Sequence, residues 1–170
     1  MRAGLQTAAV LLLAGLAGSV AVGAARDETK PGVARWLAAG DAALVAKHPL
    51  EAIDAYEAAL ALDPKNAPGF IGIARAYEAE GLPGRAIKYY REALALEPND
   101  LGALAGQGEA LIARGATTRA RVNLDRIKTL CKGECPAAKR LETALAAPPP
   151  KLPPTPLASA DPIKPVPGKP

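Results

Sequence analysis

The sequence predicts an all-α protein in which helical hairpins stack into a solenoid, and three observations lead to that fold class. One segment recurs further along the chain, apolar residues recur three and four positions apart, and cap and turn residues separate the apolar runs. Apolar spacing of this kind marks one face of a helix. A repeat that holds two such helices is a hairpin, and it buries its apolar face only by stacking on another hairpin.

The repeat is clearest over residues 33–100. The tripeptide Leu62-Asp63-Pro64 recurs one repeat later as Leu96-Glu97-Pro98. Small and aromatic residues recur under the same shift, and this combination lets two helices approach closely while aromatic side chains fill the space between them. The aligned pairs are Trp36 with Phe70, Gly40 with Ala74, Ala52 with Ala86, Tyr56 with Tyr90, and Ala59 with Ala93.

This order of small, aromatic and proline positions, with a period of about 34 residues, resembles the tetratricopeptide repeat (TPR), in which each unit is a pair of antiparallel helices. The resemblance covers about 100 of the 170 residues. It implies a right-handed superhelix whose concave wall is lined mainly by the first helix of each unit. The first helix of a unit is called helix A below, and the second is called helix B.

The first two repeats, residues 33–66 and 67–100, each divide into two predicted helices. We expect helix A at 33–46 and 67–80 and helix B at 50–62 and 84–96, with turns at 47–49 and 81–83. The pairs Asp63-Pro64 and Glu97-Pro98 end one helix, and Asn66 and Asp100 are N-cap candidates for the next. Gly81 suits its turn because glycine adopts positive φ without steric cost.

A third repeat, residues 101–132, carries weaker marks, and a capping helix at 136–146 follows it. In the third repeat, Ile127 replaces the expected alanine and Lys132 replaces the expected proline. A terminal unit is expected to depart from the pattern, because one of its faces meets something other than another repeat. The matching positions are Leu104, Gly108, Leu111, Gly115, Ala120 and Leu124, although Leu124 stands where the earlier repeats have tyrosine.

The two ends of the chain differ from the repeats in composition. Residues 1–25 combine Arg2 with a long uncharged apolar run and small residues near Ala25, which is typical of a cleaved secretory signal peptide. The alternative is an uncleaved membrane anchor, the one case in which we expect membrane contact. Cleavage predicts a protein secreted across the inner membrane into the periplasm. Residues 147–170 hold ten prolines and predict a disordered, polyproline-biased tail, so the TPR domain covers 26–146.

Charge and motifs argue against nucleic-acid binding and against catalysis. The formal net charge is +4, and the charges are interpreted as interleaved along the helices, so no nucleic-acid partner is expected. His48 is the single histidine and falls in a predicted turn, and no serine nucleophile motif is present. The glycines at 102, 106 and 108 follow no strand, so they are not a nucleotide fingerprint. We expect a protein that is not an enzyme and has no cofactor.

Cys131 and Cys135 flank the junction between the third repeat and the capping helix. A structural disulfide is the default in an exported protein. Free or regulatory thiols, and a metal or haem site, are the alternatives. Thioredoxin-type chemistry normally uses two intervening residues and haem attachment needs a following histidine, whereas here three residues intervene and Pro136 follows.

The TPR resemblance implies a site on the concave wall formed by helix A of each repeat. Apolar residues there give affinity to an extended peptide or amphipathic helix, and scattered charges fix its register. The implied groove residues are Leu37, Asp41, Leu44, Ile71, Arg75, Glu78, Ala105, Glu109 and Ile112. We also expect Arg75 to pair with Asp41 or Glu109 across adjacent helices.

The partner expected from this site is another protein or peptide, with a second copy of the chain as one option. A chaperone-binding version of the family clamps a C-terminal carboxylate with lysine and asparagine. Leu37, Asp41 and Gly72 occupy those positions here, so that role is not supported. The main hypothesis is a scaffold or assembly factor of the bacterial envelope. The alternatives are a structural envelope component that acts through self-association and its proline-rich tail, and a thiol-disulfide protein that uses Cys131 and Cys135.

Overall fold

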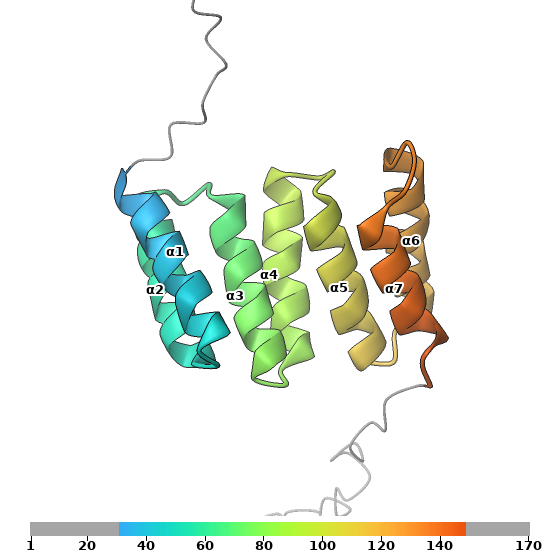
Figure 1. Ribbon diagram of the computed structural model, residues 1–170, viewed down its shortest axis with the longest axis horizontal. Helices are drawn as coiled ribbons and strands as arrows, with labels where there is room; N and C mark the ends of the chain where they lie inside the picture. The colour runs from blue at the N-terminus through green and yellow to red at the C-terminus, as the bar shows by residue number, and fades with distance from the viewer. Residues whose placement is uncertain (1–30, 149–170) are drawn as a thin grey trace, which may run out of the picture.

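The computed structural model describes residues 31–148, and this part of the chain consists of seven α-helices with no strand. Each helix runs antiparallel to the one before it, joined by a short connection, which confirms the predicted all-α hairpin solenoid (Figure 1). The helices are α1 (Pro31–Val45), α2 (Pro49–Leu62), α3 (Ala67–Ala79), α4 (Pro83–Leu96), α5 (Leu101–Ala113), α6 (Thr117–Leu130) and α7 (Pro136–Ala146).

The helices form two layers. Helices α1, α3, α5 and α7 form one row, and α2, α4 and α6 lie in the other (Figure 1). Neighbouring helices of the first row contact each other across the repeats, whereas α2, α4 and α6 have no such mutual contacts. The array is therefore closed on the side of the first row, which is the inner side of the stack. This side is called the helix-A face below.

Helix ends follow the cap residues that the sequence predicted. The Asn66 side chain accepts a hydrogen bond from the Gly69 backbone N–H at 2.9 Å, and Asp100 accepts one from Ala103 at 2.5 Å. Both interactions satisfy a backbone donor that the first turn of a helix leaves free. Pro49 and Pro83, which we placed in turns, instead begin α2 and α4, because a proline at the first helical position needs no N–H.

Three hairpin turns share one backbone conformation. Lys47, Gly81 and Gly115 occupy the same position in successive repeats and adopt φ values of 61°, 72° and 75°. Only glycine enters this left-handed region without a steric cost, so the turn suits the second and third hairpins better than the first. The geometry of the turn is therefore set by the stack, even where the local residue disfavours it.

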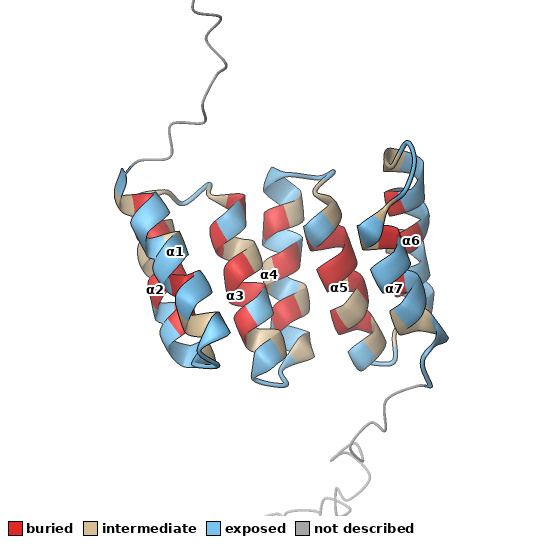
Figure 2. Ribbon diagram, viewed as in Figure 1, coloured by how far each residue is buried: buried red, intermediate tan, exposed pale blue. Residues whose placement is uncertain are grey.

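The core lies between the two layers and is built from small residues around large ones (Figure 2). The side chains of Tyr56 and Tyr90 are 1% and 2% exposed, and alanines surround them. A Cβ added at Gly72 would lie 2.4 Å from the Tyr56 ring, and one added at Gly106 would lie 2.4 Å from Tyr90. The tyrosines of the second layer therefore reach between helices of the first layer at the glycine positions.

Helix α7 caps the third repeat, as predicted. Leu141 is fully buried, and a Cβ added at Gly108 of α5 would lie 2.6 Å from its side chain. Lys128 on α6 and Glu142 on α7 form an ion pair at 2.6 Å. Helix α7 thus lies against both α5 and α6 and occupies the place of a fourth helix A.

The predicted signal peptide (1–25), its anchor alternative and nearly all of the proline-rich tail fall outside the described residues, so those three hypotheses stay predictions. Among residues 31–148, no helix has both the length and the apolar character needed to cross a bilayer.

Candidate functional site

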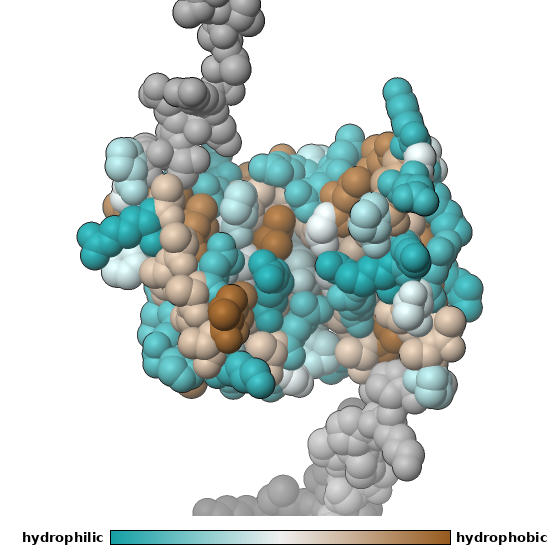
Figure 3. All heavy atoms as spheres, in the orientation of Figure 1, coloured by the Kyte–Doolittle hydropathy of each residue, from teal (hydrophilic) through white to brown (hydrophobic). Residues whose placement is uncertain are grey.

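The predicted groove residues occupy three equivalent positions on α1, α3 and α5, each recurring once per repeat. Residues 37, 71 and 105 form one set, residues 41, 75 and 109 the second, and residues 44, 78 and 112 the third. Figure 3 views this side of the molecule and shows apolar patches between hydrophilic side chains. The helix-A face is thus mixed in character rather than continuously apolar.

The apolar members of these sets are partly exposed and rest on the core. Leu37 and Leu44 pack against the cluster around Tyr56 and Ile73, and Ile112 packs against the cluster around Leu104. Ile71 packs in the same way on the cluster around Tyr90. Because their positions are fixed from below, these side chains offer preformed contact area to a ligand.

Ala105 is the exception among the predicted groove residues. It is 0% exposed and belongs to the core cluster that α7 completes together with Leu104 and Leu141. The sequence pattern placed Ala105 on the face, but the structure buries it in the cluster that α5 forms with α6 and α7. Ala105 therefore shapes the packing of the cap and gives no contact area to a ligand.

The charged members form pairs between neighbouring helices. Arg75 Nη1 lies 3.9 Å from Asp41 Oδ1, and both side chains are more than half exposed. Glu109 pairs instead with Arg140 of α7, whose Nε donates to Glu109 Oε1 at 2.6 Å. Of the two partners expected for Arg75, the structure selects Asp41. The exposed Arg75–Asp41 pair contributes only about 0–1 kcal/mol, so the Arg75 guanidinium stays available to another anion.

Two carboxylates on the face are held from behind by core tyrosines. The Tyr56 hydroxyl donates to Asp41 Oδ1 at 2.7 Å, and the Tyr90 hydroxyl donates to Glu78 Oε2 at 2.7 Å. Burial, followed by the hydrogen bond to Asp41, raises the pKa of the Tyr56 phenol. Burial, followed by the charge of Glu78 and the hydrogen bond to it, raises the pKa of the Tyr90 phenol. Both phenols therefore stay protonated at neutral pH and act as fixed donors.

Glu78 is partly buried, unlike the exposed Asp41 and Arg75 on the same face. Burial raises the pKa of its carboxyl, and the neighbouring Glu109 carboxylate acts in the same direction. The hydrogen bond from Tyr90 and the cations Arg140 and Arg75 act against that shift. The Glu78 carboxyl therefore binds a proton more readily than an exposed glutamate does.

Reasoning from sequence missed Arg140 and the hydroxyl groups of Tyr56 and Tyr90 as members of this site. Arg140 belongs to α7, which the sequence identified as a cap but not as a further contributor of charge to the face. The tyrosines were assigned to the core as space fillers. A signal for their second role was present in the glycines at 40, 72 and 106, since each removes the Cβ that would block a ring.

The two cysteines lie where the sequence placed them, at the junction between α6 and α7. Cys131 follows the last residue of α6 and Cys135 precedes the first residue of α7. Their sulfur atoms are 2.07 Å apart and their Cα atoms 6.0 Å apart. In the described part of the chain, no group of three or more His, Cys, Asp or Glu side chains is arranged to hold a metal ion.

Comparison with known proteins gives the class of this domain. The tetratricopeptide repeat family matches residues 69–110, and no curated protein matches the chain. The Sgt2 TPR domain from Aspergillus fumigatus is similar in structure, with a TM-score of 0.62, 28% identity, and coverage of 67% of this chain and 77% of that one.

Two further similar structures hold bound peptides. The first TPR of Spaghetti (RPAP3), bound to the HSP90 peptide SRMEEVD, has a TM-score of 0.60 and 23% identity and covers 68% of this chain and 94% of that one. The second TPR domain of human RPAP3, in complex with the HSP70 peptide SGPTIEEVD, has a TM-score of 0.58 and 22% identity and covers 66% and 98%. With the sequence repeat, these likenesses define a TPR-type helical solenoid and support a place in the TPR family. Folds of this class are generally interaction scaffolds without catalytic activity.

Proposed function

We propose that this protein is an exported TPR scaffold that binds a segment of another envelope protein on its helix-A face. The main support is the surface of α1, α3 and α5, where half-buried apolar side chains alternate with charged side chains. Residues of neighbouring helices hold these charged side chains in place. Leu37, Ile71 and Ile112 supply apolar contacts, and Arg75 and Glu78 supply opposite charges between them. An extended peptide or an amphipathic helix uses this combination for affinity and for register.

The bound segment is proposed to differ from the chaperone peptides held by the two RPAP3 domains. Those peptides end in the acidic sequence EEVD. At the positions where the chaperone-binding version of the family has a carboxylate clamp, this chain has an apolar side chain at Leu37, a carboxylate at Asp41 and no side chain at Gly72. Asp41 is also fixed by Tyr56 and would repel a ligand carboxylate at that point.

The proposed location in the envelope depends on the signal-peptide pattern of residues 1–25. The mixed apolar and charged residues of the helix-A face fit several partner proteins, so the partner has to be identified by experiment. Site-specific photo-crosslinking in the native cell addresses both points. A photoreactive residue placed at Ile71 should form one dominant crosslink to a second protein, whereas the same residue at Val122, which is 64% exposed on α6, should not. Equal crosslinking from both positions, or crosslinks only to cytoplasmic proteins, would contradict the proposal.

A further inference from the structure

Helix α7 has an uncovered side that the helices equivalent to it do not have. Helices α1, α3 and α5 each pack along the helix that follows them, but within residues 31–148 no helix follows α7. Residues 104, 108 and 111 of α5 become Ala138, Glu142 and Leu145 when the shift of one repeat is applied. In the first two repeats the equivalent positions lie against helix B, as Gly40 lies against Tyr56 of α2 and as Phe70 and Tyr77 pack on the cluster that contains Tyr90 of α4. In the third repeat, Gly108 lies instead against Leu141 of α7.

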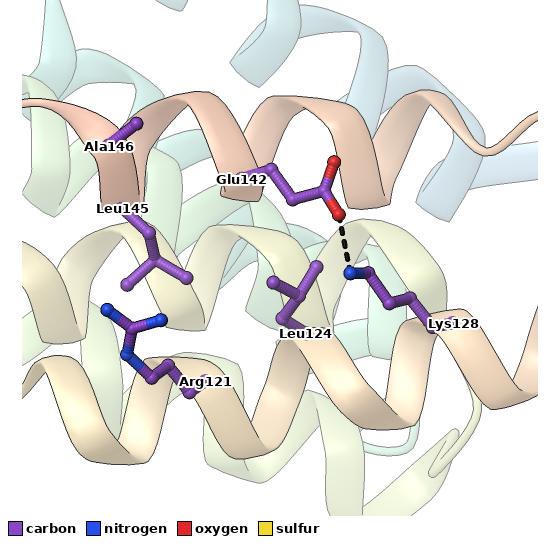
Figure 4. Close-up of a pocket in the computed structure, with 6 residues that line it drawn as sticks. All are labelled: Arg121, Leu124, Lys128, Glu142, Leu145 and Ala146. Carbon is purple, nitrogen blue, oxygen red and sulfur yellow. Dashed lines mark ion pairs between the residues drawn. The ribbon is translucent and has the colours of Figure 1, made fainter.

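Those three residues line two hollows between α6 and α7. One hollow, of about 320 Å³, is bordered by Leu124, Leu145 and Ala146, and the other, of about 440 Å³, is bordered by Ala138 and the two cysteines. Lys128 and Glu142 border both, so the two hollows adjoin along the α6–α7 seam, with the Lys128–Glu142 ion pair at their shared border. Together they are called the α6–α7 groove. Figure 4 shows Leu124 and Leu145 between the two helices. The groove therefore lies where the second helix of a fourth repeat would pack.

The rim of this groove is positively charged. Arg121, Lys128 and Lys139 border it, and the one acidic residue on it, Glu142, is already paired with Lys128 at 2.6 Å. Figure 4 shows Arg121 and Lys128 reaching from α6 toward α7. An occupant of the groove would therefore meet uncompensated positive charge along its edge.

The rim belongs to a wider division of charge in the molecule. Residues 31–113 hold seven basic and eleven acidic residues, whereas residues 114–148 hold eight basic and three acidic residues. The expectation that charges are interleaved along the helices is therefore wrong for residues 114–148. Within a Debye length of about 8 Å at physiological salt, this basic end attracts an acidic partner and repels a basic one.

We infer that the α6–α7 groove is a second docking surface, separate from the helix-A face, and that it takes an acidic amphipathic helix of a partner protein. The helix would place small and apolar residues against Leu145, which is partly exposed, and against the edges of Leu124 and Ala138, which are 7% and 6% exposed. Its carboxylates would lie beside Arg121 and Lys139, so charge carries most of the preference. The chain's own C-terminal end is a poor source of such a helix, because residues 149–170 contain nine prolines and carry three lysines against one aspartate.

The chain supplies a matched pair of probes. The α2 sequence, residues 49–62, has the small and aromatic pattern of a helix B and three acidic residues with no basic one. The α4 sequence, residues 83–96, has the same pattern with three basic residues and one acidic. Both can be made as labelled peptides with blocked ends and titrated with the purified chain by fluorescence anisotropy.

We expect the α2 peptide to bind at least about fivefold more tightly than the α4 peptide, with the preference shrinking as salt is raised. Arg121→Glu should weaken binding of the α2 peptide at least about fivefold, because it reverses a rim charge. Arg119→Glu, the same change at an exposed site on the same helix, should weaken binding of the α2 peptide less than about twofold. Arg75→Glu on the helix-A face should leave binding of the α2 peptide unchanged. Hydrogen exchange should show peptide-dependent protection in α6 and α7.

Several results would overturn the inference. These are no binding of the α2 peptide at low salt, equal binding of the two peptides, equal effects of the two α6 variants, or protection confined to α1, α3 and α5. Self-association of the chain that Arg121→Glu abolishes would show that a second copy, not another protein, fills the groove. Arg75→Glu tests the helix-A face separately from the α6–α7 groove. If the peptide titrations fail, the proposed function is unaffected. If Arg75→Glu does not weaken binding of the partner on the helix-A face, the inference about the groove is unaffected.

Discussion

At the residue scale, the stack imposes conformations and contacts that single side chains either tolerate or oppose. Lys47 adopts the left-handed backbone conformation that Gly81 and Gly115 adopt in the other two hairpin turns, although lysine pays a steric cost there. Asp41 and Glu78 keep their positions because tyrosines from the second layer donate to them. The sequence indicates the turn conformation, because residues 47, 81 and 115 are one repeat apart. It indicates the tyrosine contacts only through glycines, whose role becomes clear from the three-dimensional packing.

Replacing Lys47 with glycine should stabilise the domain. A non-glycine residue at a φ of 61° carries steric strain, and glycine removes it while adding some freedom to the unfolded chain. We expect Lys47→Gly to raise the free energy of unfolding by about 0.5–1 kcal/mol, measured by urea denaturation. Gly81→Ala, at a φ of 72°, is the reciprocal change and should lower it by a similar amount. Changes of the same sign in both variants would contradict this explanation.

Gly72 should not tolerate even a methyl group. A Cβ at this position would lie 2.4 Å from the Tyr56 ring, which is itself buried and cannot move aside. We expect Gly72→Ala to lower the midpoint of thermal unfolding clearly, with a loss of about 1–3 kcal/mol. The control is Gly102→Ala, whose Cβ would meet only the Asp100 side chain, at 3.2 Å. That variant should be neutral or more stable, and equal losses would show that space around Tyr56 is not limiting.

Glu78 should give the domain an identifiable pH dependence. Burial, mainly, raises the pKa of this carboxyl in the folded state. Its contribution to stability is therefore fully present below the pKa in the unfolded chain and is lost as pH rises through the folded pKa. Glu78→Gln has no such loss. Between about pH 4 and pH 7, the free energy of unfolding of the variant should rise relative to that of the wild type. A difference that is constant across this range in denaturant titrations would contradict the assignment.

At the scale of the helices, the decisive element is α7, because it caps the third repeat, contributes Arg140 to the helix-A face and leaves one side uncovered. Its bounds were predictable from Pro136 and the spacing of Leu141 and Leu145. Its other roles were not, since they depend on which side of α7 turns toward α5 and α6. The cysteine pair ties the start of α7 to the end of α6.

Removing the link between α6 and α7 should loosen the cap without unfolding the repeats. A bond between cysteines four apart closes a very short loop, so its entropic contribution is small. We expect Cys131→Ser with Cys135→Ser to cost about 1–2 kcal/mol of stability and to leave binding at Ile71 and Arg75 in place. Mass spectrometry of the unreduced protein, isolated from its native cell, should find no alkylatable thiol, and two alkylatable thiols would contradict a disulfide.

At the scale of the whole molecule, the fold followed from the sequence far more completely than the site did. Most helix boundaries lie at a cap, glycine or proline that recurs from one repeat to the next, so local signals and global stacking agree. The predicted face does lie on α1, α3 and α5, and its role in binding stays a prediction. The burial of Ala105 and the pairing of Glu109 with Arg140, which leaves Asp41 as the partner of Arg75, depend on how α7 docks, which no local pattern encodes. The excess of basic residues over 114–148 could have been counted in the sequence.

The helix-A face is the proposed binding surface, and one comparison of two charge-reversal variants tests that most directly. Calorimetric titration of the photo-crosslinked partner should compare the wild-type chain with Arg75→Glu on α3 and Arg91→Glu on α4. Both arginines are exposed, but only Arg75 lies on the face. We expect Arg75→Glu to weaken binding at least about tenfold with thermal unfolding nearly unchanged, and Arg91→Glu to have a far smaller effect. Equal weakening by both variants, or weakening by Arg91→Glu alone, would contradict the assignment of the helix-A face.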